Sequence, residues 1–329
     1  MFISIIIPVY NVEQYLRECL DSVVSQSFDD YEVVCINDGS SDGSLAILEE
    51  YKNRYSKIQV ISQQNKGLSG ARNVGIKAAK GDYVFFLDSD DWVEPNTLQI
   101  LFENNSGQDL LCFNGRSYYE NGFKEEPDKG ITEDKLKGWD YYCKYALVSR
   151  KFHFVCTVLR MYRNEFLIQN NLFFEEGIYH EDNLFTPIAC YKAEFVKVIP
   201  DCLYIYRRMR EGSITEPTNG QKANYKRIID TVYVSNKLSY YFIPKIGIDK
   251  LTLYREIAGG YFKPFTPGII SQYGNRDADI IKLINWTSFK SVSLYPRHKI
   301  FYRLLKIHPI AFRLYFSIEE IVKSLKRRK

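Results

Sequence analysis

The 329-residue chain lacks several patterns that define common functional classes. No Gly-x-Gly-x-x-Gly follows its first apolar run, no Walker A lysine motif is present, and no Cys/His set has zinc spacing. Its seven cysteines are an odd number without a Cys-x-x-Cys pair, which argues against both a disulfide framework and a zinc ribbon. We expect buried thiols in a reducing compartment.

No apolar stretch approaches the length that crosses a bilayer. The opening run ends at Pro8, and it carries neither a basic segment before it nor a small-residue cleavage site after it. The sequence therefore predicts a cytoplasmic protein without a membrane span. The apolar fraction of 45% and the charged fraction of 26% are typical of a globular protein.

The net charge of +4 is unevenly distributed. Between Trp286 and Lys329 there are 11 Lys/Arg and 2 Asp/Glu, a net +9, which leaves −5 for the rest of the chain. From Lys299 onward, aromatic and aliphatic residues interleave with basic ones. This pattern is typical of an amphipathic helix on an anionic membrane surface, and equally of a solvated C-terminal helix. Nucleic-acid binding is disfavoured because the basic excess is local.

The N-terminal third alternates short apolar runs with helical patterns, which predicts βαβ units and a mostly parallel sheet. Ligands of such sheets bind beyond the carboxyl ends of the strands. After about residue 115 the pattern becomes less regular, and beyond Gln221 it is mostly helical. The predicted strands are 2–8, 31–36, 58–61, 83–87 and 109–113; helices are expected around 16–24, 48–55 and 71–79, and a further one has Pro95 in its first turn.

The strongest chemical signal is Asp88-Ser89-Asp90, which directly follows an apolar strand. Carboxylates two residues apart at a strand end suit a hard divalent cation that also binds phosphate oxygens. The alternative is a solvated loop in which Asp91 caps the next helix.

Other strand ends carry weaker signals. Asp38 follows the second strand and can accept hydrogen bonds from a ribose hydroxyl or a base, or it is an ordinary turn residue. Arg72 follows a Gly-bearing loop whose helix start favours an anion; it could reach a phosphate, help hold the aspartates in place, or be a surface arginine of a capped helix. The acidic pair Glu181-Asp182 offers a general base, although the helix dipole alone explains acids there. The basic cluster 206–210 either closes over a diphosphate or lies on the surface.

Together these motifs resemble family 2 glycosyltransferases of the GT-A fold, especially bacterial enzymes that build surface polysaccharides. The resemblance covers roughly residues 1–215 and rests on the segments 4–11, 37–42, 65–75, 81–91 and 180–182. It implies a Rossmann-like, mixed and mostly parallel α/β sheet flanked by helices, followed by a helical extension. The turn-forming cluster from Thr215 to Gly220 indicates a boundary there. We therefore expect a catalytic domain at 1–218, with a nucleotide-binding half (1–115) and an acceptor and base half (116–218), and a helical region at 219–329 with the basic tail.

The resemblance also implies an inverting transfer of a hexose or N-acetylhexosamine from a nucleotide sugar, with UDP-sugars the expected donors. Asp182 would be the catalytic base, and Glu181 would bind sugar or acceptor. Asp90, with Asp88, would coordinate Mn²⁺ or Mg²⁺; a third protein ligand stays open because the region offers only His153 and His180. The implied donor-binding residues are Pro8, Tyr10, Asp38, Arg72, Asp88, Ser89 and Arg210.

The implied acceptor is a hydroxyl of a polyprenol-linked saccharide in O-antigen, capsule or exopolysaccharide synthesis, reached at the inner face of the cell membrane. A catalytically silent nucleotide-sugar-binding protein on the same fold is one alternative. A sugar nucleotidyltransferase is another, but it should have a Gly-rich basic loop after the first strand, where this chain has Val9-Tyr10-Asn11. The sequence leaves the sugar and the accepting hydroxyl undecided.

Overall fold

The structure is a computed structural model that describes residues 1–119, 122–123, 132–146, 156–208, 220–245, 251–266, 269–270 and 276–326. The chain divides into two compact units. The first comprises Met1–Gly177 and Glu181–Arg210, and the second comprises Ile178–His180 and Glu211–Lys329. The predicted boundary at 218 lies outside the described residues and stays a prediction, as do the functions assigned to its halves.

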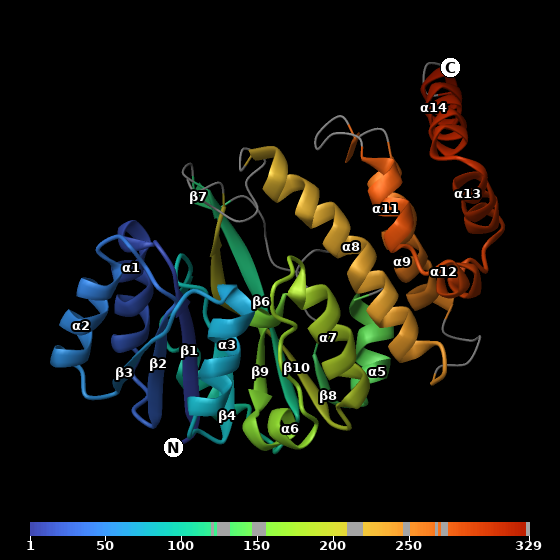
Figure 1. The fold of residues 1–329 in the computed structure, drawn as a ribbon. Coiled ribbons are helices and arrows are strands. Elements are labelled where there is room, and N and C mark those ends of the chain that lie inside the picture. The colour runs from blue at the N-terminus through green and yellow to red at the C-terminus, as the bar shows by residue number, and fades with distance from the viewer. Residues whose placement is uncertain are drawn as a thin grey trace. The chain divides into compact units, whose positions relative to one another are not determined.

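A mixed ten-stranded sheet forms the centre of the first unit (Figure 1). Its order is β3-β2-β1-β4-β9-β6-β10-β5, with β7 paired to β6 and β8 to β10. The first four strands run parallel, with helices between them, as the sequence predicted. The bounds are β1 (Ile3–Val9), α1 (Glu13–Val24), β2 (Tyr31–Asn37), α2 (Ser44–Arg54), β3 (Ile58–Ser62), α3 (Gly67–Ala78), β4 (Tyr83–Phe86), β5 (Trp92–Val93) and α4 (Thr97–Glu103).

The apolar patterns explain these elements. Every residue of β1 and β2 is buried, as expected of parallel strands covered on both faces. Two helix starts differ from the prediction. The third helix begins at Gly67 rather than near residue 71, and α4 begins at Thr97 because Asn96 has a φ of 65° and separates the helix from Pro95.

The second half of the sheet was not predicted beyond the start of β6. β9 lies antiparallel between β4 and β6, and β10 runs parallel to β6 with register shifts around Cys202. The signal was weak because β9 is short and arginine-rich, and Pro200 interrupts β10. The bounds are β6 (Leu110–Tyr119), β7 (Gly122–Phe123), β8 (Glu133–Leu136), α5 (Gly138–Tyr141), η1 (Tyr142–Ala146), η3 (Thr157–Leu159), β9 (Arg160–Arg163), α6 (Asn164–Gln169), α7 (Glu181–Lys192) and β10 (Val196–Arg207).

The second unit is helical in its described part, as predicted. Its core contains packed rings: Tyr261 stacks on Phe289 at 4.7 Å between centroids, and Phe301 meets Phe312 edge-on at 5.0 Å. Among the described helices, none is long and apolar enough to cross a membrane. The bounds are α8 (Gly220–Phe242), α9 (Leu251–Phe262), η5 (Lys263–Phe265), α11 (Asp277–Leu283), α12 (Trp286–Val292), α13 (Pro296–Ile307) and α14 (Pro309–Lys326).

A glycine lets α3 approach β1 closely. A Cβ atom at Gly75 would lie 2.2 Å from Cγ2 of Ile6, nearer than two carbon atoms can come. Arg72 lies three residues earlier on the same face of α3. The close packing therefore fixes the place at which Arg72 reaches the carboxyl edge of the sheet.

We expect Gly75→Ala to destabilise the protein by roughly 1–3 kcal/mol, because the added methyl group overpacks the contact with Ile6. Gly259→Ala is the matched control, since a Cβ at Gly259 of α9 meets no atom within 4 Å. The control should be neutral or stabilising through helix propensity. Thermal and urea unfolding followed by circular dichroism measures both; equal stability of Gly75→Ala and wild type would show that α3 adjusts freely.

Candidate active site

Polar loops meet at the carboxyl edge of β1, β2 and β4. These strands are neighbours in the sheet, with Val9 opposite Asn37 and Ile6 opposite Phe86. The backbone continues the ladder past the strand ends, since the N–H of Asp38 donates to the carbonyl of Val9 at 2.9 Å. The first residues of these loops are thus held side by side.

Asp38 is buried and organises the loop that starts α3. Its Oδ1 accepts from Nε2 of Gln63 at 2.6 Å and from the N–H of Lys66 at 2.8 Å. Its Oδ2 accepts from the N–H of Gly67 at 2.8 Å, where a φ of 76° suits glycine. The structure thus gives Asp38 a role in holding the loop, and its contact with a ligand stays a prediction.

Tyr10 is the exposed group at the end of β1. Pro8 is buried in the strand opposite Ile36, whereas the side chain of Tyr10 is 51% exposed. The following residue, Asn11, has a φ of 51°, and its Oδ1 accepts from the N–H of Ser41 at 2.8 Å. The loops after β1 and β2 are therefore tied together beneath an accessible aromatic ring.

The carboxyl groups of the acidic loop after β4 differ in burial and in their hydrogen-bond partners. Asp88 and Asp90 are half-buried, whereas Ser89 and Asp91 are buried. Asp91 accepts from the hydroxyl of Tyr204 at 2.5 Å and from the N–H of Arg207 at 2.8 Å. The alternative in which Asp91 caps the next helix is therefore wrong. Burial, with Asp90 and Asp88 nearby, raises the pKa of Asp91.

Tyr204 and Arg207, both at the end of β10, hold this loop. The Tyr204 hydroxyl also accepts from the N–H of Asp88 at 3.3 Å. Arg207 donates from Nε to the carbonyl of Asp90 at 2.9 Å, pairs with Glu18 of α1 and stacks over Trp92 at 4.6 Å. Both alternatives for the basic cluster, closing over a diphosphate or lying on the surface, leave out these three contacts of Arg207, which hold the acidic loop from within the protein.

A buried arginine joins the acidic loop to the predicted catalytic pair. The Arg72 side chain is 2% exposed; its Nη2 donates to Oδ1 of Asp88 at 2.8 Å. Its Nη1 donates to Oε1 of Glu181 at 2.9 Å and lies 3.4 Å from Oδ1 of Asp182. Three carboxyl groups, one from the loop after β4 and two from α7, thus face one guanidinium. Arg72 is 16 positions from Asp88 and 110 from Asp182 in the sequence.

Asp182 has the properties of a proton acceptor at neutral pH. Its pKa is raised to about 7: burial is the largest cause, the charge of Arg72 opposes it, and the charge of Glu181 acts in the same direction as burial. Its Oδ2 accepts from the N–H of Thr157 at 3.1 Å, which fixes the orientation of the carboxyl group.

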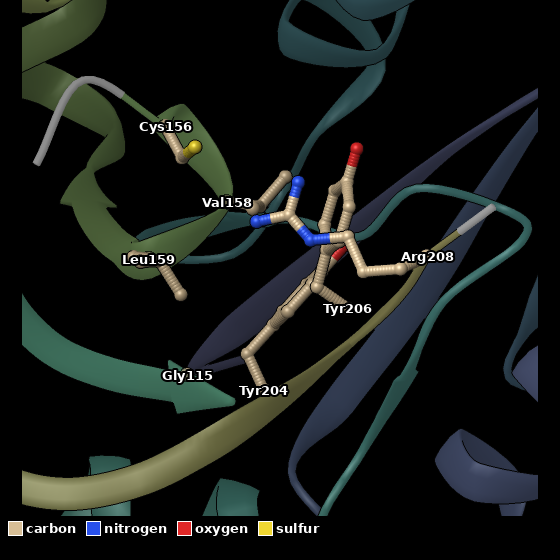
Figure 2. A pocket seen from close by; sticks show the side chains of 7 residues that line it. All are labelled: Gly115, Cys156, Val158, Leu159, Tyr204, Tyr206 and Arg208. Atoms are coloured by element: carbon tan, nitrogen blue, oxygen red, sulfur yellow. The ribbon is translucent and has the colours of Figure 1, made fainter. Parts of the chain in front are cut away.

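A pocket lies beside this pair (Figure 2). Cys156 and Val158, on either side of Thr157, contribute to its wall, and Arg208 lies over the ring of Tyr206 at 4.2 Å. Tyr204 lines the pocket as well and connects it to the acidic loop. Among the described residues, the pocket is lined by Gly115, Cys156, Val158, Leu159, Tyr204, Tyr206 and Arg208.

The described residues provide no group of three or more His, Cys, Asp or Glu side chains that could hold a metal ion. Asp88 and Asp90 nevertheless suit a cation that binds together with a diphosphate, because Mg²⁺ commonly takes one or two carboxylates plus substrate phosphates. His180 belongs to the second unit, and burial, with Lys263 and Arg227 nearby, lowers its pKa to about 4. His153 and Arg210 lie outside the described residues.

A model of the family "Glycosyl transferase family 2" matches residues 4–170. The chain belongs to this family. The match covers β1 to α6 and includes the loops after β1, β2 and β4, and the predicted resemblance is confirmed.

Relatives of this chain agree with the family assignment. It is 38% identical over 223 residues to an uncharacterized glycosyltransferase, EpsJ of Bacillus subtilis, covering 65% of this chain and 63% of EpsJ. It is 31% identical to the poly(ribitol-phosphate) β-N-acetylglucosaminyltransferase TarS of Staphylococcus aureus, covering 64% of this chain and 36% of TarS. The chain thus spans less than two thirds of the length of these two relatives.

Solved structures confirm the GT-A fold. TarS residues 1–349 in complex with UDP-GlcNAc superpose with a TM-score of 0.62 at 20% identity, covering 97% of this chain and 92% of that one. The mannosyltransferase PcManGT of Pyrobaculum calidifontis, in complex with GDP-Man and Mn²⁺, gives 0.52 at 14% identity, covering 96% and 86%. At these identities the likeness concerns the fold.

We expect Tyr204→Phe to loosen the acidic loop, because it removes the donor to the buried Asp91 and the acceptor for the Asp88 N–H. The free energy of unfolding should fall by about 1–3 kcal/mol, the usual cost of an unsatisfied buried group. Tyr206→Phe is the matched control on the same strand. Urea unfolding of both variants measures the difference; equal values would show that the hydroxyl of Tyr204 does not hold the loop.

Proposed function

We propose that this protein is an inverting, metal-dependent glycosyltransferase that moves a hexose or N-acetylhexosamine from a UDP-sugar to a saccharide hydroxyl. The observation that carries the proposal is the contact of buried Arg72 with both Asp88 and the Glu181–Asp182 pair. This contact supports the proposal because the carboxyl group that we assign to the donor's metal and the one that we assign to proton transfer share one guanidinium. Both reacting partners can therefore meet at this point.

Electrostatics favours a divalent cation in this site. The carboxyl groups around Arg72 outnumber it, and Asp90 adds a further one on the same loop. A diphosphate brought among these groups would be repelled without an added positive charge. When bound, Mn²⁺ or Mg²⁺ would neutralise the charge that develops on the leaving diphosphate. Asp90 and Asp88 are the residues that would hold it.

The donor nucleotide would lie over the ends of β1 and β2. Tyr10 offers an exposed ring to the base, and Asp38 would accept a hydrogen bond from the ribose or the base. Pro8, at the end of β1, is a further candidate for donor contact. Ser89 and Arg210 are our further candidates for donor contact. The bound UDP-GlcNAc of TarS supports UDP as the nucleotide carrier.

The transfer is a single displacement. The acceptor hydroxyl gives its proton to Asp182 while its oxygen forms a bond to the anomeric carbon from the face opposite the leaving group. The bond between that carbon and the diphosphate oxygen breaks, UDP leaves, and the configuration inverts. Glu181 would bind the sugar or the acceptor. Arg208, which lies in the adjacent pocket, is a further candidate for contact with the diphosphate.

For the acceptor we propose a polyprenol-linked saccharide in the synthesis of O-antigen, capsule or exopolysaccharide, used at the inner face of the cell membrane. The names of the relatives support a cell-surface polymer, since TarS acts on poly(ribitol-phosphate).

Asp182→Asn should lower turnover by about 10²–10⁴-fold, the usual contribution of a general base, and leave UDP binding largely intact. In the wild type, kcat should rise as pH increases through about 7, because only the ionised carboxylate accepts a proton. Glu181→Gln should move this rise to lower pH, since the charge of Glu181 raises the pKa of Asp182.

Asp29→Asn, at an exposed surface position, is the control for these variants. Steady-state UDP release between pH 5 and 9 supplies the profiles. Normal turnover of Asp182→Asn would remove Asp182 from the mechanism.

The proposal as a whole is tested by UDP release from a panel of UDP-sugars with Mn²⁺ and with EDTA. We expect release from one donor, abolished by EDTA, and a loss of Mn²⁺-dependent UDP binding in Asp90→Ala measured by calorimetry. Asp82→Ala is the control, because Asp82 is exposed just before β4 at the opposite edge of the sheet. Equal Mn²⁺-dependent UDP affinity of Asp90→Ala and wild type would contradict the metal role.

A further inference from the structure

Two C-terminal helices of the second unit leave aliphatic side chains uncovered. On α13, Ile300 is 40% and Ile307 is 77% exposed. On α14, Ile310, Leu314 and Ile318 are 53%, 59% and 61% exposed. These three recur at every fourth position and therefore form one stripe along the helix. A single exposed aliphatic residue is ordinary, but a continuous stripe indicates a surface that meets a partner.

Basic side chains border the isoleucines of α13. Lys299, Arg303 and Lys306 are all exposed, and Arg303 lies three residues after Ile300 and four before Ile307. Within the described ranges, none of the three cations makes an ion pair with an acidic side chain, whereas Arg313 of α14 is paired with Asp277. The charge on α13 is thus available to an anionic partner.

The combination of basic and aliphatic side chains on α13 and α14 fits some kinds of partner better than others. A second copy of the chain would bring the same cations together, which like-charge repulsion opposes. A nucleic acid would use the cations and leave the isoleucines exposed to water. An anionic bilayer uses both, because the apolar side chains enter the acyl boundary while the basic ones meet the headgroups.

We propose that α13 and α14 dock the protein on an anionic lipid bilayer. The docking face comprises Lys299, Ile300, Arg303, Lys306 and Ile307 of α13 with Ile310, Leu314 and Ile318 of α14. The helices lie in the interface, consistent with the finding that no described helix is long and apolar enough to cross the membrane. The docking itself does not depend on the proposed function. Only its purpose does, because docking would bring the protein to a lipid-linked acceptor.

Binding of the full-length protein to vesicles tests the inference. We expect sedimentation with vesicles of phosphatidylcholine and phosphatidylglycerol, little with phosphatidylcholine alone, and weaker binding at high salt. Lys299→Glu/Arg303→Glu/Lys306→Glu should weaken binding by about 100-fold or more, and Ile310→Ser/Leu314→Ser/Ile318→Ser by about tenfold or more. Lys282→Glu/Leu283→Ser on α11 is the matched control, since both residues are exposed in the same unit, and it should bind as wild type does.

Three outcomes would overturn the inference. They are absence of wild-type binding to anionic vesicles, equal binding by the charge-reversal variant, and a dimer in lipid-free sedimentation that the serine variant converts to a monomer. The last would identify the face as an interface between copies. UDP release from soluble donor should be unchanged in all variants, and vesicle binding without any UDP release would sink the proposed function while leaving the docking face intact.

Discussion

The structure of the candidate site depends on the ion pairs of one buried arginine. Arg72 of α3 binds Asp88 at the end of β4 and the Glu181–Asp182 pair at the start of α7. Without the guanidinium, these carboxyl groups would repel one another in a partly buried space, and the loop after β4 would separate from α7. The same contact opposes the effect of burial on Asp182, so that its pKa stays at about 7. One side chain thus sets both the geometry and the protonation of the site.

Two further sets of hydrogen bonds hold the loops at the carboxyl edge of the sheet around Arg72, and both include backbone N–H donors. Asp38 holds the loop that enters α3, and Asp91 with Tyr204 and Arg207 holds the loop that follows β4. Both carboxylates are buried and accept from the chain itself. Tyr10, Asp88 and Asp90 are the groups of this edge that reach the surface. A precisely positioned site needs such surface groups to be held by buried residues behind them.

The parallel half of the fold was predictable because β1 and β2 are apolar on both faces and the helices between them are periodic. The order of the motifs also led to the family. The half of the sheet that contains the antiparallel strand β9 was not predictable from the sequence. β9 has only four residues, with arginines at both ends, and β10 contains Pro200. Nor could the sequence pair Arg72 with Asp182 or Tyr204 with Asp91, because these contacts span 110 and 113 positions and depend on tertiary packing. The sequence shows that position 91 is acidic, but not that this side chain is buried and bonded to Tyr204.

The pH dependence of kcat in Arg72→Gln tests the central role of the arginine most directly. Because the guanidinium holds the pKa of Asp182 down against burial, the account predicts that the rise in kcat moves to higher pH and that activity at neutral pH falls. Circular dichroism would establish that the variant is folded. A folded Arg72→Gln whose profile coincides with that of the wild type would contradict the account.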